Sequence, residues 1–206
     1  MRKLPRMSAL AFGGVLAVCA FAVPMARAAS WATVGTNHVL ASTNLAFTST
    51  IGPNPVGSSC ADTEFGATVA NAAVLFINSA AFRNCMGTLA TTNCTTTMTA
   101  NAASLPWTAT AVLTTNIQIH NVDVSVTFEN TPGVVGVCPF LGVTSRLTGT
   151  LTGGVWHPSA TGSVRRITFE HDDNLVMHSN VTPTVTAPAF MTGSFRDTTA
   201  TLNVFD

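Results

Sequence analysis

The chain has 206 residues, with nine Lys or Arg and nine Asp or Glu, so its formal charge is zero. Four of the basic residues lie within the first 28 positions, and residues 29–206 keep five arginines, nine acids and no lysine. The absence of clustered positive charge excludes strong electrostatic binding to nucleic acid or to an anionic membrane.

The first 28 residues have the three parts of a secretory signal peptide. Three basic residues lie within the first six positions, an apolar core covers residues 9–23, and Ala26-Arg27-Ala28 forms an A-x-A cleavage motif. A lipoprotein would use Cys19, but Val18 stands where lipoprotein processing favours a small residue. We therefore interpret residues 1–28 as a signal peptide.

Residues 29–206 are enough for one domain with a sizeable core. No run within them approaches the roughly 18 apolar residues that a membrane helix needs. We expect a single exported domain with no membrane span, secreted to the extracellular space or held at the cell surface.

Threonine determines the expected fold class. The chain contains 33 threonines, all after residue 28, among many Val, Ile, Ala, Gly and Ser residues. Beta-branched residues favour strands, and the long straight-chain helix formers are nearly missing. This composition predicts an all-β protein.

Residues 117–129 alternate between apolar and polar side chains, as a half-buried strand does. Ile117 and Ile119 fall on one parity and Val122 to Phe128 on the other, so the phase changes at His120-Asn121. One extra residue at that point would let both halves keep their apolar side inward. The pattern therefore predicts a β-bulge at His120-Asn121.

Turn signals rich in Gly, Pro, Asn and Asp separate further strands. Residues 70–81 are rich in alanine, so a helix competes with a strand there. Roughly ten strands without intervening helical patterns indicate an antiparallel β-sandwich or a jelly-roll-like fold. The expected strands cover residues 44–50, 63–70, 74–84, 95–101, 107–114, 117–129, 141–152, 162–170, 175–180 and 190–205.

Four cysteines follow the signal segment: Cys60, Cys85, Cys94 and Cys138. An even number in an exported chain predicts two disulfides, with three possible connectivities. Residues 86–93 resemble a hairpin loop, and closing a short loop costs little chain entropy, so the spacing favours Cys85–Cys94 and leaves Cys60–Cys138. A zinc site would need closely spaced cysteine pairs, which the chain lacks.

The densest polar cluster follows Phe169. Two or three carboxylates can bind Ca²⁺, and two histidines with an acid can hold a transition metal. A hairpin turn at Asp173-Asn174 is the favoured interpretation, because Asp and Asn tolerate turn conformations and no calcium-loop motif is present. The weak metal candidates are Glu170, His171, Asp172, Asp173 and His178.

Trp156 lies between Gly153-Gly154 and His157-Pro158, which indicates a loop and makes this residue the best candidate for an exposed ligand contact. The chain has no G-x-S-x-G or H-E-x-x-H motif, and scattered acids are expected on any domain surface. We assign no catalytic residue and expect no cofactor.

Several short segments share a pattern with a known type of protein. Cys60 precedes a Thr/Ala-rich strand, Cys85 and Cys94 precede the stretch TANAASLPW, and Cys138 precedes LTGTLTG. In these features the chain resembles secreted β-rich proteins of uncharacterised function from actinobacteria. That type has a further cysteine before its final strand, whereas residues 187–190 have none. The departure favours Cys60 as the partner of Cys138, and the resemblance implies no known activity.

The sequence thus favours a non-catalytic β-sandwich that acts outside the cell or on its surface as a binding or structural module. The alternative is a secreted hydrolase or a metal-dependent ligand-binding protein that uses the region from Glu170 to His178. Self-association within the cell envelope is a third interpretation, because few charges would oppose edge-to-edge pairing of strands.

Overall fold

The structure is a computed structural model that describes residues 30–31, 33–88, 93–113, 116–157, 165–180, 185–199, 202 and 204–205. The signal-peptide interpretation of residues 1–28 falls outside this part of the chain. Among the residues described, no helix is long and apolar enough to cross a membrane.

Almost all of the described chain is β-strand, with one short 3-10 turn, η1. Residues 70–81, where a helix competed, form the end of one strand and the start of the next. The elements are β1 (Ser30–Trp31), β2 (Asn37–Ser42), β3 (Leu45–Ile51), β4 (Asn54–Asn71), β5 (Val74–Thr88), β6 (Cys94–Ala100), η1 (Ala102–Ser104), β7 (Trp107–Leu113), β8 (Asn116–Asn130), β9 (Thr144–His157), β10 (Arg166–Ser179), β11 (Val185–Asp197) and β12 (Val204–Phe205).

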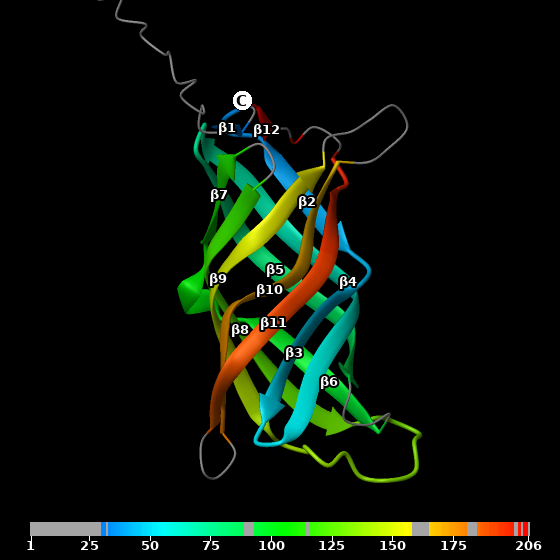
Figure 1. The fold of residues 1–206 in the computed structure, drawn as a ribbon. Helices are drawn as coiled ribbons and strands as arrows, with labels where there is room; N and C mark the ends of the chain where they lie inside the picture. Colours follow the sequence, from blue (N-terminus) through cyan, green and yellow to red (C-terminus); the bar gives the residue numbers. More distant parts are fainter. Residues whose placement is uncertain are drawn as a thin grey trace, which may run out of the picture.

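Strands β2 to β11 form one antiparallel sheet that closes on itself (Figure 1). Neighbours run in the order β4, β3, β11, β10, β9, β8, β6 and β5, and β5 then pairs with β4. Strand β2 shares the place of β3 between β4 and β11, and β7 shares the place of β6 between β8 and β5. The short pair of β1 with β12 lies at one end of this cylinder (Figure 1).

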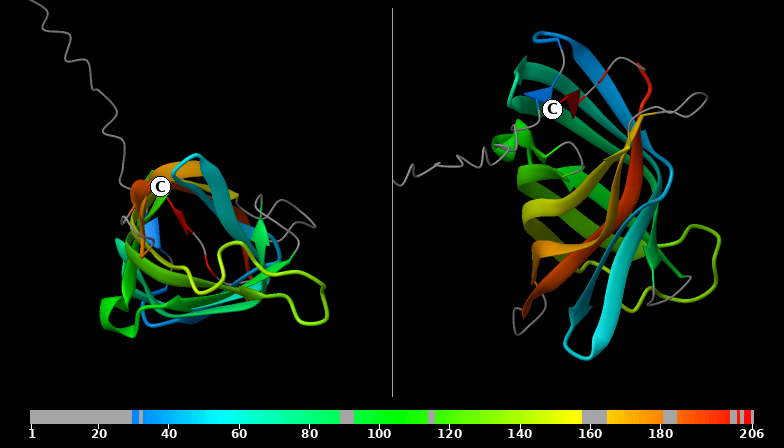
Figure 2. Two further views of the ribbon diagram at one scale, coloured as in Figure 1. Left: turned by 90° about the horizontal axis from the view of Figure 1, so that it is seen from below. Right: turned by 45° about the horizontal axis from the view of Figure 1, so that its top comes forward.

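The all-β antiparallel class, with about ten strands and two disulfides, is confirmed. The two layers expected of a sandwich are opposite walls of one continuous sheet, as the view along the cylinder shows (Figure 2). Closure joins β4 to β5, whereas β5 and β6 pair at one register position, Met86 with Thr95. The self-association interpretation, which rests on edge-to-edge strand pairing, stays a prediction.

The core fills the inside of the cylinder because alternate side chains of each strand point inward. In β4, for example, Phe65, Ala67 and Val69 are buried while their neighbours are half-exposed. The Phe65 ring stacks on Phe195 with centroids 4.5 Å apart and meets Trp107 edge-on at 5.7 Å. Side chains from three separate parts of the chain thus form one aromatic cluster.

The bulge expected in β8 is confirmed. Its register with β9 shifts between Ile119 and Val122, and Asn121 has a positive φ of 61°. Strand β10 has a similar irregularity, with φ of 60° at His171. Between the two bulges, Gly149 of β9 pairs with both neighbours, so three adjacent strands change register at the same height of the cylinder.

The predicted disulfide pairing was wrong: the bonds join Cys60 to Cys85 and Cys94 to Cys138. Cys60 and Cys85 are register partners in the pairing of β4 with β5, which brings their Cα atoms to 4.0 Å. The other bond ties the start of β6 to the β8–β9 connection. Strand register, rather than the length of the loop between cysteines, determines which sulfurs meet.

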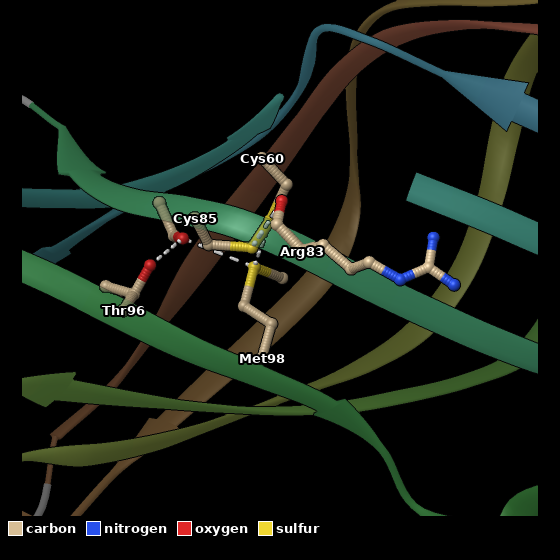
Figure 3. The surroundings of a disulfide bond; sticks show 6 residues. Cys60, Arg83, Cys85, Thr96 and Met98 are labelled. Carbon is tan, nitrogen blue, oxygen red and sulfur yellow. Dashed lines mark hydrogen bonds between the residues drawn. A yellow bond between two sulfur atoms is a disulfide. The ribbon is translucent and has the colours of Figure 1, made fainter. Parts of the chain in front are cut away.

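Figure 3 shows how the first disulfide packs inside the sheet. The Met98 sulfur lies 3.2 Å from Cys60 Sγ, on the side where the hydroxyls of Ser58 and Thr96 form a hydrogen bond. Cys60 is 1% exposed. This disulfide is therefore part of the core rather than an accessible redox pair.

Candidate functional site

The polar cluster that suggested a metal site lies within β10, and the hairpin turn predicted at Asp173-Asn174 was wrong. Strand β10 continues past these residues because it pairs with β9 on one side and with β11 on the other. The extra residues form the irregular stretch between Phe169 and Leu175. What looked like a turn is a bulge in a continuous strand.

The members of this cluster point to different surroundings. The His171 ring stacks on Phe190 with centroids 4.3 Å apart, whereas His178 lies farther along β10, where Nδ1 is 3.3 Å from the Thr186 hydroxyl. Glu170 is exposed. The side chains of Asp172 and Asp173 lie outside the part that the structure describes. Across the described residues, no three His, Cys, Asp or Glu side chains are grouped to hold a metal ion.

Trp156, predicted as an exposed contact, is instead buried near the end of β9. Gly153 and Gly154 belong to the strand rather than to a loop, and Trp156 pairs with Ile167 of β10. A Cβ on Gly154 would lie only 2.8 Å from the Phe169 ring, so the glycine lets this ring pack against the backbone. Gly154 therefore serves close packing, and both glycines lie in the strand and not in a turn.

A hydroxyl, an imidazole and a carboxylate follow one another at the end of the cylinder that β1 and β12 cover. Thr36 Oγ1 lies 2.7 Å from His38 Nε2, and His38 Nδ1 lies 3.7 Å from Asp197 Oδ1. The closer partner of Nδ1 is the Thr199 hydroxyl at 3.0 Å, which itself donates to Asp197. The carboxylate therefore does not orient the imidazole directly, as it would in a nucleophilic triad.

Asp197 instead holds the chain in place after β11. Its carboxylate accepts hydrogen bonds from the backbone N–H groups of Thr199 and Leu202, at 3.1 and 2.8 Å. Arg165 adds a hydrogen bond to the Leu202 carbonyl at 3.0 Å. This network is structural: it fixes the segment that leads to β12.

The inside of the cylinder offers little room for a ligand. A cavity of about 20 Å³ lies among Phe47, Val126, Ser145 and Met177. That volume suits one water molecule. Ser145 is buried, and its hydroxyl has no hydrogen-bond partner within the described chain. A water molecule there would satisfy the Ser145 hydroxyl.

The β8–β9 connection, residues 131–143, is the most exposed apolar element of the described surface, and we name it the valine loop. Val135 is 97% exposed and Val137 is 67% exposed. Val134 and Leu141 follow at 42% and 51%. Figure 1 shows the loop projecting from the end of the cylinder opposite β1 and β12. Single exposed apolar residues are common, whereas four on one projecting loop form a concentrated apolar surface.

The base of the valine loop is tightly held. Cys138 is bonded to Cys94, and its backbone N–H donates to Asn130 Oδ1 at 2.7 Å. The Phe140 ring packs on Phe128 with centroids 5.7 Å apart. The backbone N–H of Gly142 also donates to the Phe128 carbonyl at 2.9 Å. These contacts present the valines on a fixed support.

The valine loop and the strands beside it carry very little charge. Residues 44–61, 84–122 and 130–145 contain no Asp, Glu, Lys or Arg, and residues 174–195 contain only one ionisable side chain, His178. The nearest acid along the chain is Glu129 at the end of β8. This end of the cylinder is therefore apolar at its tip and carries little charge around it, with Glu129 as the nearest acid along the chain.

An ion pair joins Asp123 of β8 to Arg146 of β9. Arg146 donates to Asp123 through Nε at 2.8 Å and through Nη2 at 2.6 Å, and Asn101 Nδ2 donates to the same carboxylate at 3.0 Å. The hydrogen bonds from Arg146 hold the pKa of the Asp123 carboxyl below its usual value. Both groups are thus occupied in joining η1 to the outer face of β8 and β9.

Comparison with protein-family models, curated proteins and solved structures finds no match to this chain. Sequence reasoning missed the valine loop, although a signal was present: the run VVGV interrupts the alternation between a Pro-Gly turn and the Cys138-Pro139 pair. Apolar residues that belong to neither a strand nor a helix pattern are candidates for exposure.

Proposed function

We propose that this protein is an exported, non-catalytic binding or structural module that acts at the cell surface or in the extracellular space. The valine loop is its contact element. The observation that carries the proposal is a tightly held apolar loop, with Val135 97% exposed, on a cylinder whose core residues enclose a cavity of about 20 Å³. Two disulfides support an oxidising compartment.

The proposal is tested by retention on the envelope of the producing cells. The wild-type protein should sediment with washed cells, and the double variant Val135→Ser/Val137→Ser should move to the medium. A matched control is Val39→Ser/Val155→Ser, because these two valines are also exposed, at 37% and 39%, but lie in β2 and β9. Equal retention of all three proteins would contradict the role of the loop.

The alternative, a metal-dependent ligand-binding protein or hydrolase that uses Glu170 to His178, is tested separately. Elemental analysis of the purified protein and thermal-shift series with Ca²⁺ and Zn²⁺ would reveal a bound ion. An ion that is present in the wild type and lost in Asp173→Ala would favour the alternative. A protein without an ion, whose melting temperature neither metal raises, would favour the non-catalytic module.

A further inference from the structure

We propose that the valine loop docks this protein on an electrically neutral lipid surface, with Val135 and Val137 inserted among the lipid headgroups. The inference rests on the proposed function, because it names the partner of the same loop. It is an attachment to one face of a membrane and involves no spanning segment.

The shape of the loop favours a lipid surface. Val135 is 97% exposed and Val137 is 67% exposed, so the tip is convex and in contact with little else. A protein partner or a second copy of this chain would need a hollow shaped to accept this tip. The hollows on the outer surface of the cylinder, of about 550 and 480 Å³, are wide and open, and polar residues such as Arg146, His178 and Asn174 contribute to their lining. A lipid surface has no fixed shape and can accommodate a convex apolar tip.

The distribution of polarity around the loop also fits a headgroup layer. The tip is apolar, and the base carries neutral polar side chains, among them Asn130, Thr131 and Thr144. Burial of valine and leucine side chains supplies the attraction, while amides and hydroxyls can stay hydrogen-bonded to headgroups and water. Because no charged side chain lies within residues 130–145, none must be desolvated when the tip enters.

The net negative charge of residues 29–206 indicates which kind of lipid the protein would bind. Residues 29–206 hold nine acids against five arginines and no lysine, and Glu129 stands beside the loop. An anionic lipid surface would repel this arrangement, since attraction to such lipids needs Lys or Arg near the membrane. The preferred surface is therefore neutral, and its binding should not depend on salt.

The support of the loop limits how deep the tip can enter. Valine is stiff because of its branched Cβ, and the Cys94–Cys138 bond anchors the loop to β6. Backbone N–H and C=O groups of a loop cannot lie unpaired in the hydrocarbon layer. Insertion is thus confined to the depth of the valine side chains, which makes the attachment shallow and reversible.

The experiment is vesicle co-sedimentation of the purified protein after removal of residues 1–28. With vesicles of phosphatidylcholine alone, Val135→Asp/Val137→Asp should reduce the bound fraction at low occupancy by about tenfold or more, because two buried side chains are replaced by charged ones. Val39→Asp/Val155→Asp adds the same charge elsewhere and should bind as the wild type does. Thermal unfolding of each variant verifies that it is folded.

Two further conditions sharpen the test. Addition of phosphatidylglycerol should weaken binding of the wild type, and 0.5 M NaCl, roughly a fivefold rise over 0.1 M, should leave binding to phosphatidylcholine unchanged. Equal binding of wild type and loop variant, or binding that needs phosphatidylglycerol and disappears in salt, would overturn the proposal.

The outcomes separate this inference from the proposed function. If the wild type ignores phosphatidylcholine vesicles but is retained on cells through Val135 and Val137, the contact element stands and its partner is a protein. If the serine variants are retained on cells as well as the wild type, the contact role itself fails. If light scattering shows loop-dependent dimers in the absence of lipid, the partner is a second copy and the lipid proposal is wrong.

Discussion

His38 and Asp197 lie side by side at the end of the cylinder opposite the valine loop, with imidazole Nδ1 3.7 Å from carboxylate Oδ1. Both residues are almost fully buried, at 2% and 1% exposure. Burial lowers the pKa of His38, and the Asp197 carboxylate only partly offsets that effect. For Asp197 the donors Thr199 and Leu202 overcome burial and leave its pKa lowered.

The lowered pKa values of His38 and Asp197 predict that the protein loses stability in acid. A histidine whose folded pKa lies below the unfolded value of about 6.5 stabilises the fold above that pH, and the contribution is lost as pH falls through the folded pKa. The free energy of unfolding, measured in urea between pH 7.5 and 5, should therefore decrease in the wild type. His38→Gln should remove most of this decrease. His178→Gln is the control, since that ring is exposed, and it should keep the wild-type pH profile.

The ion pair of Asp123 with Arg146 leads to a second prediction, in which stability changes at a lower pH than for His38. Asp123→Asn keeps the shape of the side chain but loses the charge that accepts from Arg146 and Asn101. Hydrogen bonds to a charged group contribute about 1.5–3 kcal/mol, and solvent around the half-exposed Arg146 reduces this value, so at pH 7 the variant should be less stable by about 1–2 kcal/mol. The difference should vanish as pH falls through the lowered pKa of Asp123, because the wild-type carboxyl is then also neutral.

Urea unfolding at pH 7 and near pH 2.5 measures this difference. The exposed ion pair of Arg83 with Glu64, at 3.0 Å, provides the control. Glu64→Gln should change stability little at either pH, because solvent screens an exposed pair. A constant deficit of Asp123→Asn at both pH values would mean that shape, and not charge, is responsible.

Local patterns in the sequence predicted the strands and one detail of their geometry. The change of parity at Asn121 identified a bulge that the β8–β9 register confirms. Closure of the sheet was beyond such reasoning, because it depends on pairings between strands far apart in the chain, such as β2 with β11. The alternation of apolar and polar residues predicts which face of a strand points inward, but it does not predict which other strand pairs with it.

The candidate site was harder to predict for the same reason. Asp173-Asn174 has the composition of a turn, yet pairing of β10 on both sides keeps the strand continuous. Gly153-Gly154 next to Trp156 suggested a loop, whereas both glycines lie in β9 and Gly154 makes room for the Phe169 ring. In both places tertiary pairing overrides local preference. Val135 is exposed because the β8–β9 connection lies beyond the end of the sheet. Amino-acid composition alone does not predict where the sheet ends.

The Cys94–Cys138 bond should contribute to stability mainly through the unfolded chain. It closes a loop with a sequence separation of 44, for which the chain-entropy model gives about 4 kcal/mol. Cys94→Ser/Cys138→Ser should lower the free energy of unfolding by up to that amount. The Cys60–Cys85 bond closes a shorter loop, with a separation of 25, but Cys60→Ser/Cys85→Ser also removes a buried bond from the core.

Peptide mapping without reduction verifies the connectivity on which this prediction depends. Linked peptides should join Cys60 to Cys85 and Cys94 to Cys138. A peptide that joins Cys85 to Cys94 would contradict the register of β4 with β5. Retention of full stability in Cys94→Ser/Cys138→Ser would show that Phe128, Phe140 and Asn130 hold the valine loop without the bond.

Gly154 allows a test of how closely the walls of the cylinder are packed. It lies in β9 opposite Phe169 on one side and Ile117 on the other. A Cβ added there would lie 2.6 Å from the Ile117 carbonyl oxygen and 2.8 Å from the Phe169 ring. Neither the β8 backbone nor a buried ring can move away easily, so Gly154→Ala should destabilise the fold by about 1–3 kcal/mol, as overpacking does.

The neighbouring substitution Val155→Ala is the matched control, because Val155 points outward from the same strand and is 39% exposed. It should change the urea midpoint little. If Gly154→Ala were as stable as Val155→Ala, the Phe169 ring would have room to move, and β9 would not need a glycine at this position. A large loss at Gly154 alone would assign the glycine to packing rather than to backbone conformation, since its φ lies outside the left-handed region.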